Sequence, residues 1–389
     1  MSNKQFFSDF GLIGDNLELK KNINIEINNE GRIVEISYDD LGDNDILSIE
    51  EKKSLMMPGF INSHVHIGDS FAKEAGINMN LDDVVAPPNG LKHRLLGLIP
   101  EAIKIKGMIN AVLEMLSNGI TFFIDFRENG LHGINLLKKA LKDFTINYQV
   151  LGRFKTFNEV KPVYKIADGI GLPSYSHISP NVKELLRKLI SKKKKIIACH
   201  DSELVRNDTI LDDIIQDDLV KIIIHGTQYL NEDLKIIKEK KLSLVLCPRS
   251  NGYFGVGFPP IDNIVKLDIP ISLGTDNVMV NSLDLFEEMR YLYFIFRVLS
   301  KDNLESRLSS KELLKMVTVN AAKNFELESK YGSISKDKFA DFFIIDLNAP
   351  NFYFHKLENK NIFQIIVQRT KSENIKRTYI RGELVFERK

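Results

Sequence analysis

The stretch Met57-Pro58-Gly59-Phe60-Ile61-Asn62-Ser63-His64-Val65-His66 decides how the rest of the chain is interpreted. Its apolar residues predict a short buried strand, and that strand ends in two histidines separated by one residue. Side chains two residues apart in an extended chain point to the same side. His64 and His66 can therefore bind one metal ion together. Taken alone, the spacing is more often explained by a buried pair of hydrogen-bonded histidines.

Beyond this stretch, short apolar runs alternate with helical patterns. Seven further runs predict strands, at 121–126, 148–154, 169–173, 195–200, 221–225, 242–247 and 271–276. The residues between them place apolar side chains three and four positions apart, as in 103–118 and 232–241, which predicts helices. Eight strand–helix units over about 270 residues match an α/β fold of the (β/α)8 TIM barrel type. A doubly wound parallel sheet is the alternative.

Both ends of the chain have a different pattern. Apolar and polar residues alternate in 23–27 and 32–36, with a turn at Asn29-Glu30-Gly31 between them. A similar pattern returns in 341–346 and 378–386. We therefore expect residues 1–57 and 331–389 to form one small composite β-sandwich domain. The barrel, residues 58–330, is then inserted between its two halves.

The composition narrows the class of protein. The 389 residues include 53 Lys and Arg against 52 Asp and Glu, so the charge balance gives no argument for nucleic acid or an acidic membrane as partner. Only two cysteines occur, Cys199 and Cys247, which predicts a reduced, cytoplasmic protein without a disulfide framework. The first residues lack an apolar signal core, and no run of 18 apolar residues occurs. We expect neither secretion by that route nor membrane insertion.

The barrel prediction places the polar residues at the strand ends in one candidate active site, because TIM-barrel active sites lie at the carboxyl ends of the strands. His64 and His66 close the first strand, His200 the fifth, His225 the sixth and Asp276 the eighth. Three imidazoles and one carboxylate suit Zn²⁺, with Fe²⁺ or Mn²⁺ as alternatives. A divalent ion with an open position lowers the pKa of a bound water from ~15.7 toward ~7. Asp276 can bind the ion, accept the proton of that water, or do both.

Two further residues suit proton transfer. Glu203 follows His200 by three positions, so it lies in the first turn after the fifth strand. A carboxylate there can carry a proton to a ring nitrogen or a leaving group. His225 is close enough in barrel order to orient a hydroxide or polarise the substrate. If His200 is not a ligand, Glu203 is better explained as a surface residue at the start of a helix.

Four motifs in this order resemble the amidohydrolase superfamily, and most of all its mononuclear deaminase and chlorohydrolase branch. They are Pro58 to His66, His200-Asp201-Ser202-Glu203, His225-Gly226 and Leu273-Gly274-Thr275-Asp276. The stretches Cys247-Pro248-Arg249-Ser250-Asn251 and 281–290 are similar to it as well. That branch includes adenosylhomocysteine/methylthioadenosine, guanine, cytosine and aminofutalosine deaminases. The resemblance also implies a (β/α)8 barrel with a flanking β-sandwich.

The resemblance implies a set of roles for these residues. His64, His66, His200 and Asp276 bind the metal, Glu203 shuttles protons and His225 supports the hydroxide. Binuclear members carry a carboxylated lysine at the end of the fourth strand, and strand 169–173 ends without one. Lys155 follows the third strand and qualifies only if the strand count is off by one. We therefore expect one divalent ion, with zinc favoured over iron or manganese.

The implied enzyme is a hydrolase of carbon–nitrogen bonds other than peptide bonds. Metal-bound hydroxide attacks the carbon that bears the amine of a purine, pyrimidine or related heterocycle, and ammonia leaves. The alternatives are opening of a cyclic amide, as in imidazolonepropionase-like members, chlorohydrolase-type displacement, or a non-catalytic homologue. The substrate is a small heterocycle for deamination, for opening of a cyclic amide and for chlorohydrolase-type displacement. A homodimer is a further expectation from the resemblance.

Two departures from the usual deaminase pattern leave the substrate open. Asn277 follows Asp276 where a glycine is common, and the stretch after His66 lacks the pattern of nucleoside-type deaminases. Residues 84–94 form a loop with turn residues and two nearby cations, which can cover the barrel mouth. Three arginines can hold a substrate carboxylate or phosphate, or make a salt bridge at the barrel rim instead. They are Arg127, Arg153 and Arg249.

Overall fold

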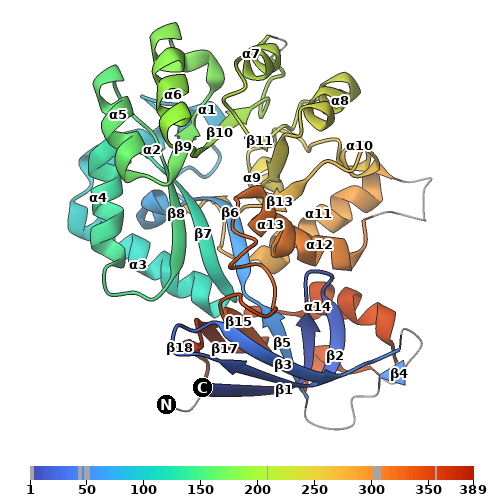
Figure 1. Ribbon diagram of the computed structural model, residues 1–389. Helices are drawn as coiled ribbons and strands as arrows, with labels where there is room; N and C mark the ends of the chain where they lie inside the picture. The colour runs from blue at the N-terminus through green and yellow to red at the C-terminus, as the bar shows by residue number, and fades with distance from the viewer. Residues whose placement is uncertain (1–3, 43–45, 48–52, 208, 301–307, 355–356) are drawn as a thin grey trace.

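The computed structural model describes residues 4–42, 46–47, 53–207, 209–300, 308–354 and 357–389. Figure 1 shows two bodies of structure, a barrel of strands ringed by helices and a separate sheet below it. The sheet contains the blue N-terminal and red C-terminal strands together, and both chain ends lie beside it.

The barrel is a single parallel sheet. Its strands are β6 (Phe60–His66), β7 (Ile120–Arg127), β8 (Asn147–Gly152), β9 (Gly169–Leu172), β10 (Ile196–Asp201), β11 (Ile222–His225), β12 (Ser243–Leu246), β13 (Ile271–Leu273) and β14 (Asp276–Asn277). The eighth strand is split, because β13 pairs with β12 while β14 pairs with β6. That split closes the sheet into a barrel, and the predicted TIM-barrel fold is confirmed.

Gly274 allows the closure. A Cβ on this residue would lie 2.6 Å from the Cβ of His64 and 2.7 Å from its backbone nitrogen. Real Cβ atoms do not approach other atoms so closely, so only glycine lets the eighth strand come this near β6. The residue that closes the barrel therefore packs directly on a candidate metal ligand.

Helices surround the barrel on its outer side (Figure 1). They are α3 (Glu101–Ser117), α4 (Gly130–Leu141), α5 (Phe157–Ile166), α6 (Pro180–Lys192), α7 (Ile210–Asp217), α8 (Asn231–Glu239), α9 (Pro248–Tyr253), α10 (Ile261–Lys266), α11 (Leu285–Leu299), α12 (Ser310–Met316) and α13 (Val319–Asn324). The predicted helices at 103–118 and 232–241 correspond to α3 and α8. Apolar residues such as Val112, Leu137 and Ile237 fill the layer between these helices and the strands.

The terminal sheet has seven strands in the order β18-β17-β15-β5-β1-β2-β3. Their bounds are β1 (Lys4–Ile13), β2 (Glu18–Ile27), β3 (Ile33–Asp39), β5 (Ser54–Pro58), β15 (Phe342–Asp346), β17 (Ile375–Ile380) and β18 (Glu383–Glu387). A two-stranded sheet pairs β4 (Ile46–Leu47) with β16 (Leu357–Glu358), and α14 (Ile362–Arg369) packs against α11 and α12. Strand β5 joins the two chain ends by pairing with both β1 and β15. The proposed domain boundaries stay between residues 57 and 58 and between residues 330 and 331, where the terminal domain meets the barrel domain.

The predicted first strand at 57–66 is in fact two strands in different sheets. Strand β5 ends at Pro58 and β6 begins at Phe60, with Gly59 between them. A Cβ on Gly59 would lie 2.1 Å from Oγ1 of Thr121 on β7. Glycine therefore lets the chain cross from the terminal sheet into the barrel where β7 passes close by.

The segment that follows β6 is mostly helical. It contains the 3-10 helix η1 (Ile67–Ala72) and the helices α1 (Leu81–Val85) and α2 (Leu91–Leu98). The predicted loop at 84–94 is therefore a turn only between Ala86 and Gly90. Lys92, on α2, is buried with 2% of its surface exposed.

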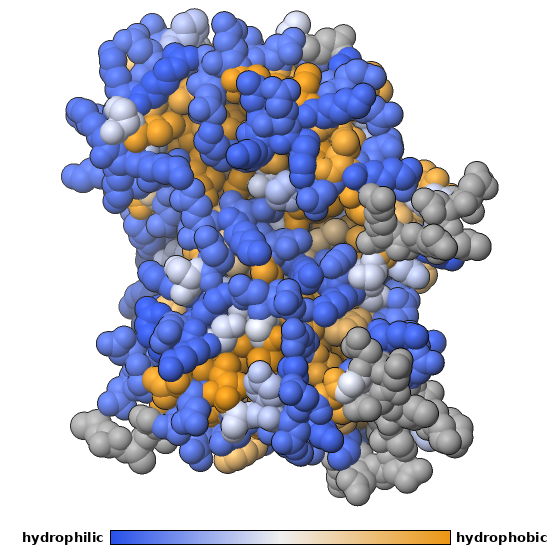
Figure 2. All heavy atoms as spheres, turned by 45° about the vertical axis from the view of Figure 1, so that its right-hand side comes forward, coloured by the Kyte–Doolittle hydropathy of each residue, from blue (hydrophilic) through white to orange (hydrophobic). Residues whose placement is uncertain are grey.

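One face of the molecule is predominantly polar (Figure 2). Figure 2 shows hydrophilic side chains over most of one face, with hydrophobic side chains visible between them. Among the residues that the structure describes, no helix is both long enough and apolar enough to cross a bilayer.

Candidate metal centre and active site

Side chains from three strands meet at the carboxyl end of the barrel. Nε2 of His64 lies 3.2 Å from Oδ1 of Asp276 and 3.2 Å from Nε2 of His200. Nε2 of His66 lies 3.5 Å from the same Asp276 oxygen. The donor atoms of His64, His66 and His200 all lie within 4.8 Å of one another. The four predicted ligands are thus brought together, although they are up to 212 positions apart in the sequence.

The hydrogen bonds behind the imidazoles fix which nitrogen faces this centre. Nδ1 of His200 lies 2.9 Å from the carbonyl of Leu172, and Nδ1 of His66 lies 3.0 Å from the carbonyl of Phe126. A carbonyl oxygen only accepts, so both Nδ1 atoms carry the proton. Their Nε2 lone pairs are left to point at the shared centre, which is the tautomer that a divalent ion requires.

Burial also holds the imidazoles neutral. It lowers the pKa of His64 to about 4 and that of His66 to about 3, in both cases mainly by desolvation. Asp276 is buried too, but hydrogen bonding to His64 and electrostatic interaction with the neighbouring imidazoles outweigh desolvation and hold its pKa well below the usual range. Three neutral nitrogens and one carboxylate are the donor set that fits Zn²⁺ or a similar divalent ion.

The carboxylate is held by the strand end and by a hydroxyl group. Asp276 has a φ of 60° and His225 a φ of 72°, both in the left-handed region that non-glycine residues rarely adopt. Such residues cost about 1–3 kcal/mol each and concentrate at functional sites. Oγ of Ser250, on α9, donates a hydrogen bond of 2.6 Å to Oδ2 of Asp276. The other oxygen of Asp276, Oδ1, therefore faces His64 and His66.

Glu203 and His225 form a pair beside the centre. Oε2 of Glu203 lies 3.4 Å from Nε2 of His225. Burial raises the pKa of Glu203 to about 7, although the electrostatic interaction with His225 opposes the shift. A carboxyl group with such a pKa can both accept and release a proton near neutral pH.

His225 differs from the other imidazoles in what lies behind it. Its Nδ1 is 3.3 Å from the amide Nδ2 of Asn251, which also donates to Thr227 at 3.1 Å. An amide nitrogen donates, so Nδ1 of His225 accepts and the proton is placed on Nε2, facing Glu203. Although His225 forms a second cluster with His64 and Asp276, this tautomer suits a hydrogen-bond donor better than a metal ligand.

Of the three predicted substrate arginines, Arg153 lines a cavity large enough for a substrate, whereas the cavity beside Arg127 is only about 10 Å³. The cavity beside Arg153, of about 820 Å³, lies at the ends of β7, β8 and β9 and is also lined by His93, Glu128, Lys155 and Leu172. Nε of Arg153 has no hydrogen-bond partner, and its Nη1 lies 3.9 Å from Oε1 of Glu128. The guanidinium therefore retains donors for another group.

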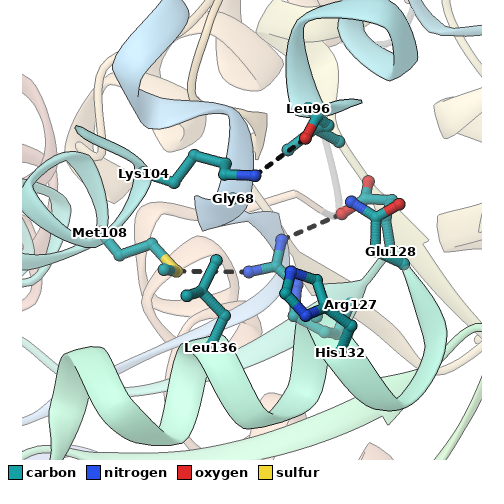
Figure 3. Close-up of a pocket in the computed structure, with 10 residues that line it drawn as sticks. Gly68, Leu96, Lys104, Met108, Arg127, Glu128, His132 and Leu136 are labelled. Carbon is teal, nitrogen blue, oxygen red and sulfur yellow. Dashed lines mark hydrogen bonds and ion pairs between the residues drawn. The ribbon is translucent and has the colours of Figure 1, made fainter. Parts of the chain in front are cut away.

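Arg127 and Arg249 are held in salt bridges instead. Arg127 is 3% exposed and points away from the barrel axis toward α3 and α4, as Figure 3 shows. It lies 3.4 Å from Asp125, 3.0 Å from Glu128 and 3.4 Å from the sulfur of Met108. Its neighbour Phe126 faces the barrel interior, so strand alternation sends Arg127 to the helix side.

Arg249 is turned toward α11. Its guanidinium lies 2.9 Å from Glu287 and 3.7 Å from the buried Glu288, and it donates to Oγ of Ser282 at 3.1 Å. For both arginines the structure favours the salt-bridge alternative, because their donors are already engaged.

The strand count behind the single-metal prediction is confirmed. Strand β9 is the fourth of the barrel and ends at Leu172. Lys155 follows the third strand, β8, and its side chain is exposed. The fourth strand therefore offers no lysine at the position where binuclear members carry one.

Three residues of this site are not predicted from the sequence. Glu128 lies 2.7 Å from Nδ1 of His66, Lys92 lies 2.6 Å from Glu128, and Ser250 holds Asp276. Ser250 falls inside a stretch with family resemblance, and Glu128 directly follows a strand end, so both offered a weak signal. Nothing in the sequence connects Lys92 to either.

Comparison with known proteins agrees with this geometry. Residues 55–385 match the model of the Amidohydrolase family. A putative aminohydrolase of Methanothermobacter thermautotrophicus is 32% identical over 356 residues, covering 87% of this chain and 88% of that protein. A 5-methylthioadenosine/S-adenosylhomocysteine deaminase of Thermoanaerobacter pseudethanolicus is 27% identical over 384 residues, covering 87% and 83%.

A solved structure shows the same fold. The zinc-bound adenosine deaminase of Xanthomonas campestris superposes with a TM-score of 0.79 at 17% identity, covering 98% of this chain and 92% of that one. The family model spans most of the chain, and the Methanothermobacter relative exceeds 30% identity over most of both proteins. The chain therefore belongs to the amidohydrolase family of hydrolases.

Proposed function

We propose that this amidohydrolase is a metal-dependent deaminase that removes the amino group of a purine, pyrimidine or related heterocycle by hydrolysis. The observation that carries the proposal is the meeting of three imidazole nitrogens and the Asp276 carboxylate beside the Glu203–His225 pair. The similarity to a protein named as a 5-methylthioadenosine/S-adenosylhomocysteine deaminase supports this reaction.

The proposed metal ligands are His64, His66, His200 and Asp276, and we propose one ion, with zinc favoured over iron or manganese. Such an ion supplies hydroxide at neutral pH by lowering the pKa of a water from 15.7 to about 7. The neutral imidazoles and the bare Nε2 lone pairs of His66 and His200 fit this ion.

The chain supplies the proton transfers. Asp276 accepts the proton of the attacking water through the oxygen that faces the histidines. Glu203, with a pKa near 7, delivers a proton to the ring nitrogen next to the reacting carbon. His225 donates from Nε2 toward Glu203 and the reacting oxygen, because Asn251 holds the opposite nitrogen as an acceptor.

We propose that Arg153 binds the part of the substrate that lies away from the metal. It lines the cavity of about 820 Å³, which is large enough for more than a free base, and its guanidinium, with only a 3.9 Å ion pair to Glu128, suits a carboxylate or phosphate. Arg127 and Arg249 are left out of this proposal because their guanidinium groups are engaged in salt bridges.

The test is a screen of aminated purines, pyrimidines and nucleosides for ammonia release, together with metal analysis of the purified protein. We expect release from at least one compound, loss of metal and activity in His200→Ala, and a loss of about 100- to 10,000-fold in Glu203→Gln with the metal retained. Glu232→Gln, an exposed carboxyl on α8, serves as the control and keeps full activity.

Other outcomes separate the alternatives. Opening of a cyclic amide, or displacement of chloride, without ammonia release from any amine would move the assignment to those reactions of the same site. A protein that holds no transition metal and stays inert after metal loading would point to a non-catalytic homologue. We also propose a cytoplasmic location, since Cys199 and Cys247 are both free thiols. Homodimer formation is a further proposal, tested by molecular mass in solution.

A further inference from the structure

Lys92 is a buried lysine with three acidic or amide partners. It sits on α2, in the segment between β6 and the first long helix, and only 2% of its surface is exposed. Its Nζ lies 2.6 Å from Oε1 of Glu128, 2.7 Å from Oδ1 of Asn277 and 3.5 Å from Oδ2 of Asp69. The contact with Asn277 is a hydrogen bond, and the two carboxylates are ion-pair partners of the ammonium group.

Two of these partners lead directly to the proposed metal ligands. The same Oε1 of Glu128 lies 2.7 Å from Nδ1 of His66, on the side of the ring opposite the metal centre. Asn277 directly follows Asp276 and is paired with His66 in the β14–β6 register. One ammonium group on α2 thus joins β7 and β14 at the point where two ligands are held.

Glu128 has its second oxygen fixed from the other side. Oε2 lies 3.0 Å from the guanidinium of Arg127, which Figure 3 shows beside Met108 and Leu136. Arg127 therefore holds one carboxylate oxygen, and Lys92 sets the oxygen that faces His66. Without Lys92, the carboxylate loses the ion pair that holds this oxygen beside Nδ1 of His66.

We propose that Lys92 is a positioning residue of the metal centre, and that it couples the order of the segment 81–98 to metal binding. It touches no ligand itself and acts through Glu128 on His66 and through Asn277 on the strand of Asp276. Partners that orient ligating histidines affect metal affinity about 10- to 100-fold, and any such coupling is reciprocal. The inference rests on the metal site of the proposed function and is independent of the reaction.

Lys104 provides a matched comparison. It is also a buried lysine, 6% exposed, and its Nζ donates to the carbonyl of Leu96 on α2 at 2.9 Å. It thus holds the same helix from α3, as Figure 3 shows, through a carbonyl and not through the carboxylate behind His66. Loss of either lysine loosens α2, but only loss of Lys92 removes the link to the metal ligands.

The experiment measures zinc affinity by competition with a chromogenic chelator for the full chain and for Lys92→Met, Lys92→Arg and Lys104→Met. We expect Lys92→Met to bind zinc about 10- to 100-fold more weakly, with affinity partly restored in Lys92→Arg, which keeps a cation. Lys104→Met should stay within about twofold of the wild type, because it leaves Glu128 and Asn277 in place. A folded Lys92→Met protein with wild-type zinc affinity would overturn the proposal.

A second measurement needs no variant and holds even if Lys92→Met fails to fold. Amide hydrogen exchange of the wild type is compared with and without zinc. We expect metal removal to speed exchange in α2, residues 91–98, as well as at the end of β6, since coupling acts in both directions. If the exchange rate in α2 is the same with and without zinc, the coupling is overturned while the proposed metal site stands. A wild type that binds no zinc overturns the metal site and this inference together.

Discussion

At the scale of single residues, the atom behind each imidazole decides what that imidazole can do. His66 and His200 have carbonyl oxygens behind Nδ1 and so offer Nε2 as a lone pair. His225 has an amide nitrogen behind Nδ1 and so offers Nε2 as a donor. Histidines at neighbouring strand ends are thereby divided between binding a cation and holding a hydrogen bond.

Replacing Asn251 by aspartate should reverse this assignment for His225. A carboxylate accepts from Nδ1, which removes the proton from Nε2 and with it the donor that faces Glu203. We expect a fall in kcat of about 10- to 100-fold, with the metal content unchanged because Asn251 contacts no proposed ligand. Steady-state kinetics and metal analysis check this. The matched change Asn324→Asp, at an amide that donates to Ser272 on β13, should leave kcat near wild type.

Ser250 offers a second residue-scale prediction. Ser250→Ala removes the 2.6 Å hydrogen bond to Oδ2 of Asp276, and the freed carboxylate can rotate. We expect zinc affinity to fall by about tenfold or more, in the range typical of groups that orient metal ligands. Chelator competition measures this. An unchanged affinity would mean that the backbone at Asp276 holds the carboxylate without the hydroxyl.

At the scale of elements, the barrel closes where β13 and β14 pass β6. The two short strands are separated by Gly274 and Thr275, and they pair with different neighbours. Oγ1 of Thr275 accepts a hydrogen bond of 2.8 Å from Asn62, and its backbone nitrogen donates to the same side chain at 3.1 Å. Closure and ligand placement therefore depend on the same few residues.

Gly274→Ala should disturb both. The added Cβ would lie 2.6 Å from Cβ of His64, so β6 or the eighth strand must move. We expect a loss of about 1–3 kcal/mol in the free energy of unfolding and weaker zinc binding, because His64 shifts. Urea unfolding and chelator competition measure the two effects. Gly97→Ala is the control, since a Cβ there meets open space and alanine favours the helix.

At the scale of the whole molecule, the barrel and the terminal sheet are joined through Asp341. Its backbone oxygen accepts from the nitrogen of Gly59, and Oδ1 accepts from the nitrogen of Arg381 at 2.8 Å. Oδ2 accepts a hydrogen bond of 2.6 Å from Asn147 on β8. Burial nevertheless raises the pKa of Asp341 to about 7, so the fold favours its neutral form.

This pKa gives stability a pH dependence with a definite sign. Between about pH 4 and pH 7 the folded state holds a proton that the unfolded chain has lost. The contribution of Asp341 is therefore full below pH 4 and declines as pH rises through 7, by at most about 1.4 kcal/mol per pH unit. Asp341→Asn should remove its own share of the slope from the metal-free protein, because Glu203 also has a raised pKa and adds a decline of its own. Asp346→Asn, on the half-buried β15 carboxyl, should keep it, and equal slopes in all three proteins would contradict the assignment.

Metal binding should stabilise the whole barrel, because the proposed ligands come from β6, β10 and β14. An ion that binds only the folded state adds about 2.7 kcal/mol when its free concentration is a hundred times Kd. We expect Tm to rise with zinc concentration and to fall on chelation, and His200→Ala to abolish that dependence. Calorimetry of the apo and zinc-loaded proteins measures it.

The sequence by itself determined the barrel and its strand order, and it named the proposed ligands that the fold brings together. Buried parallel strands are continuous apolar runs, and their ends fall in a fixed order around one rim, so His64, His200 and Asp276 could be assigned to one site. Most of strand β1 was not predicted, because its adjacent Phe6 and Phe7 break the alternation of apolar and polar residues. The predicted first strand of the barrel proved to be two strands, β5 and β6.

Only the tertiary structure decided what surrounds the ligands. Lys92 reaches Asn277 across 185 positions of sequence, and Glu128 reaches His66 across 62. Arg127 lies on the helix side of β7, and for that reason it makes salt bridges and not a substrate contact. The spacing of apolar residues along the sequence does not encode such contacts. The position of a long side chain depends on which distant groups the fold brings within its reach.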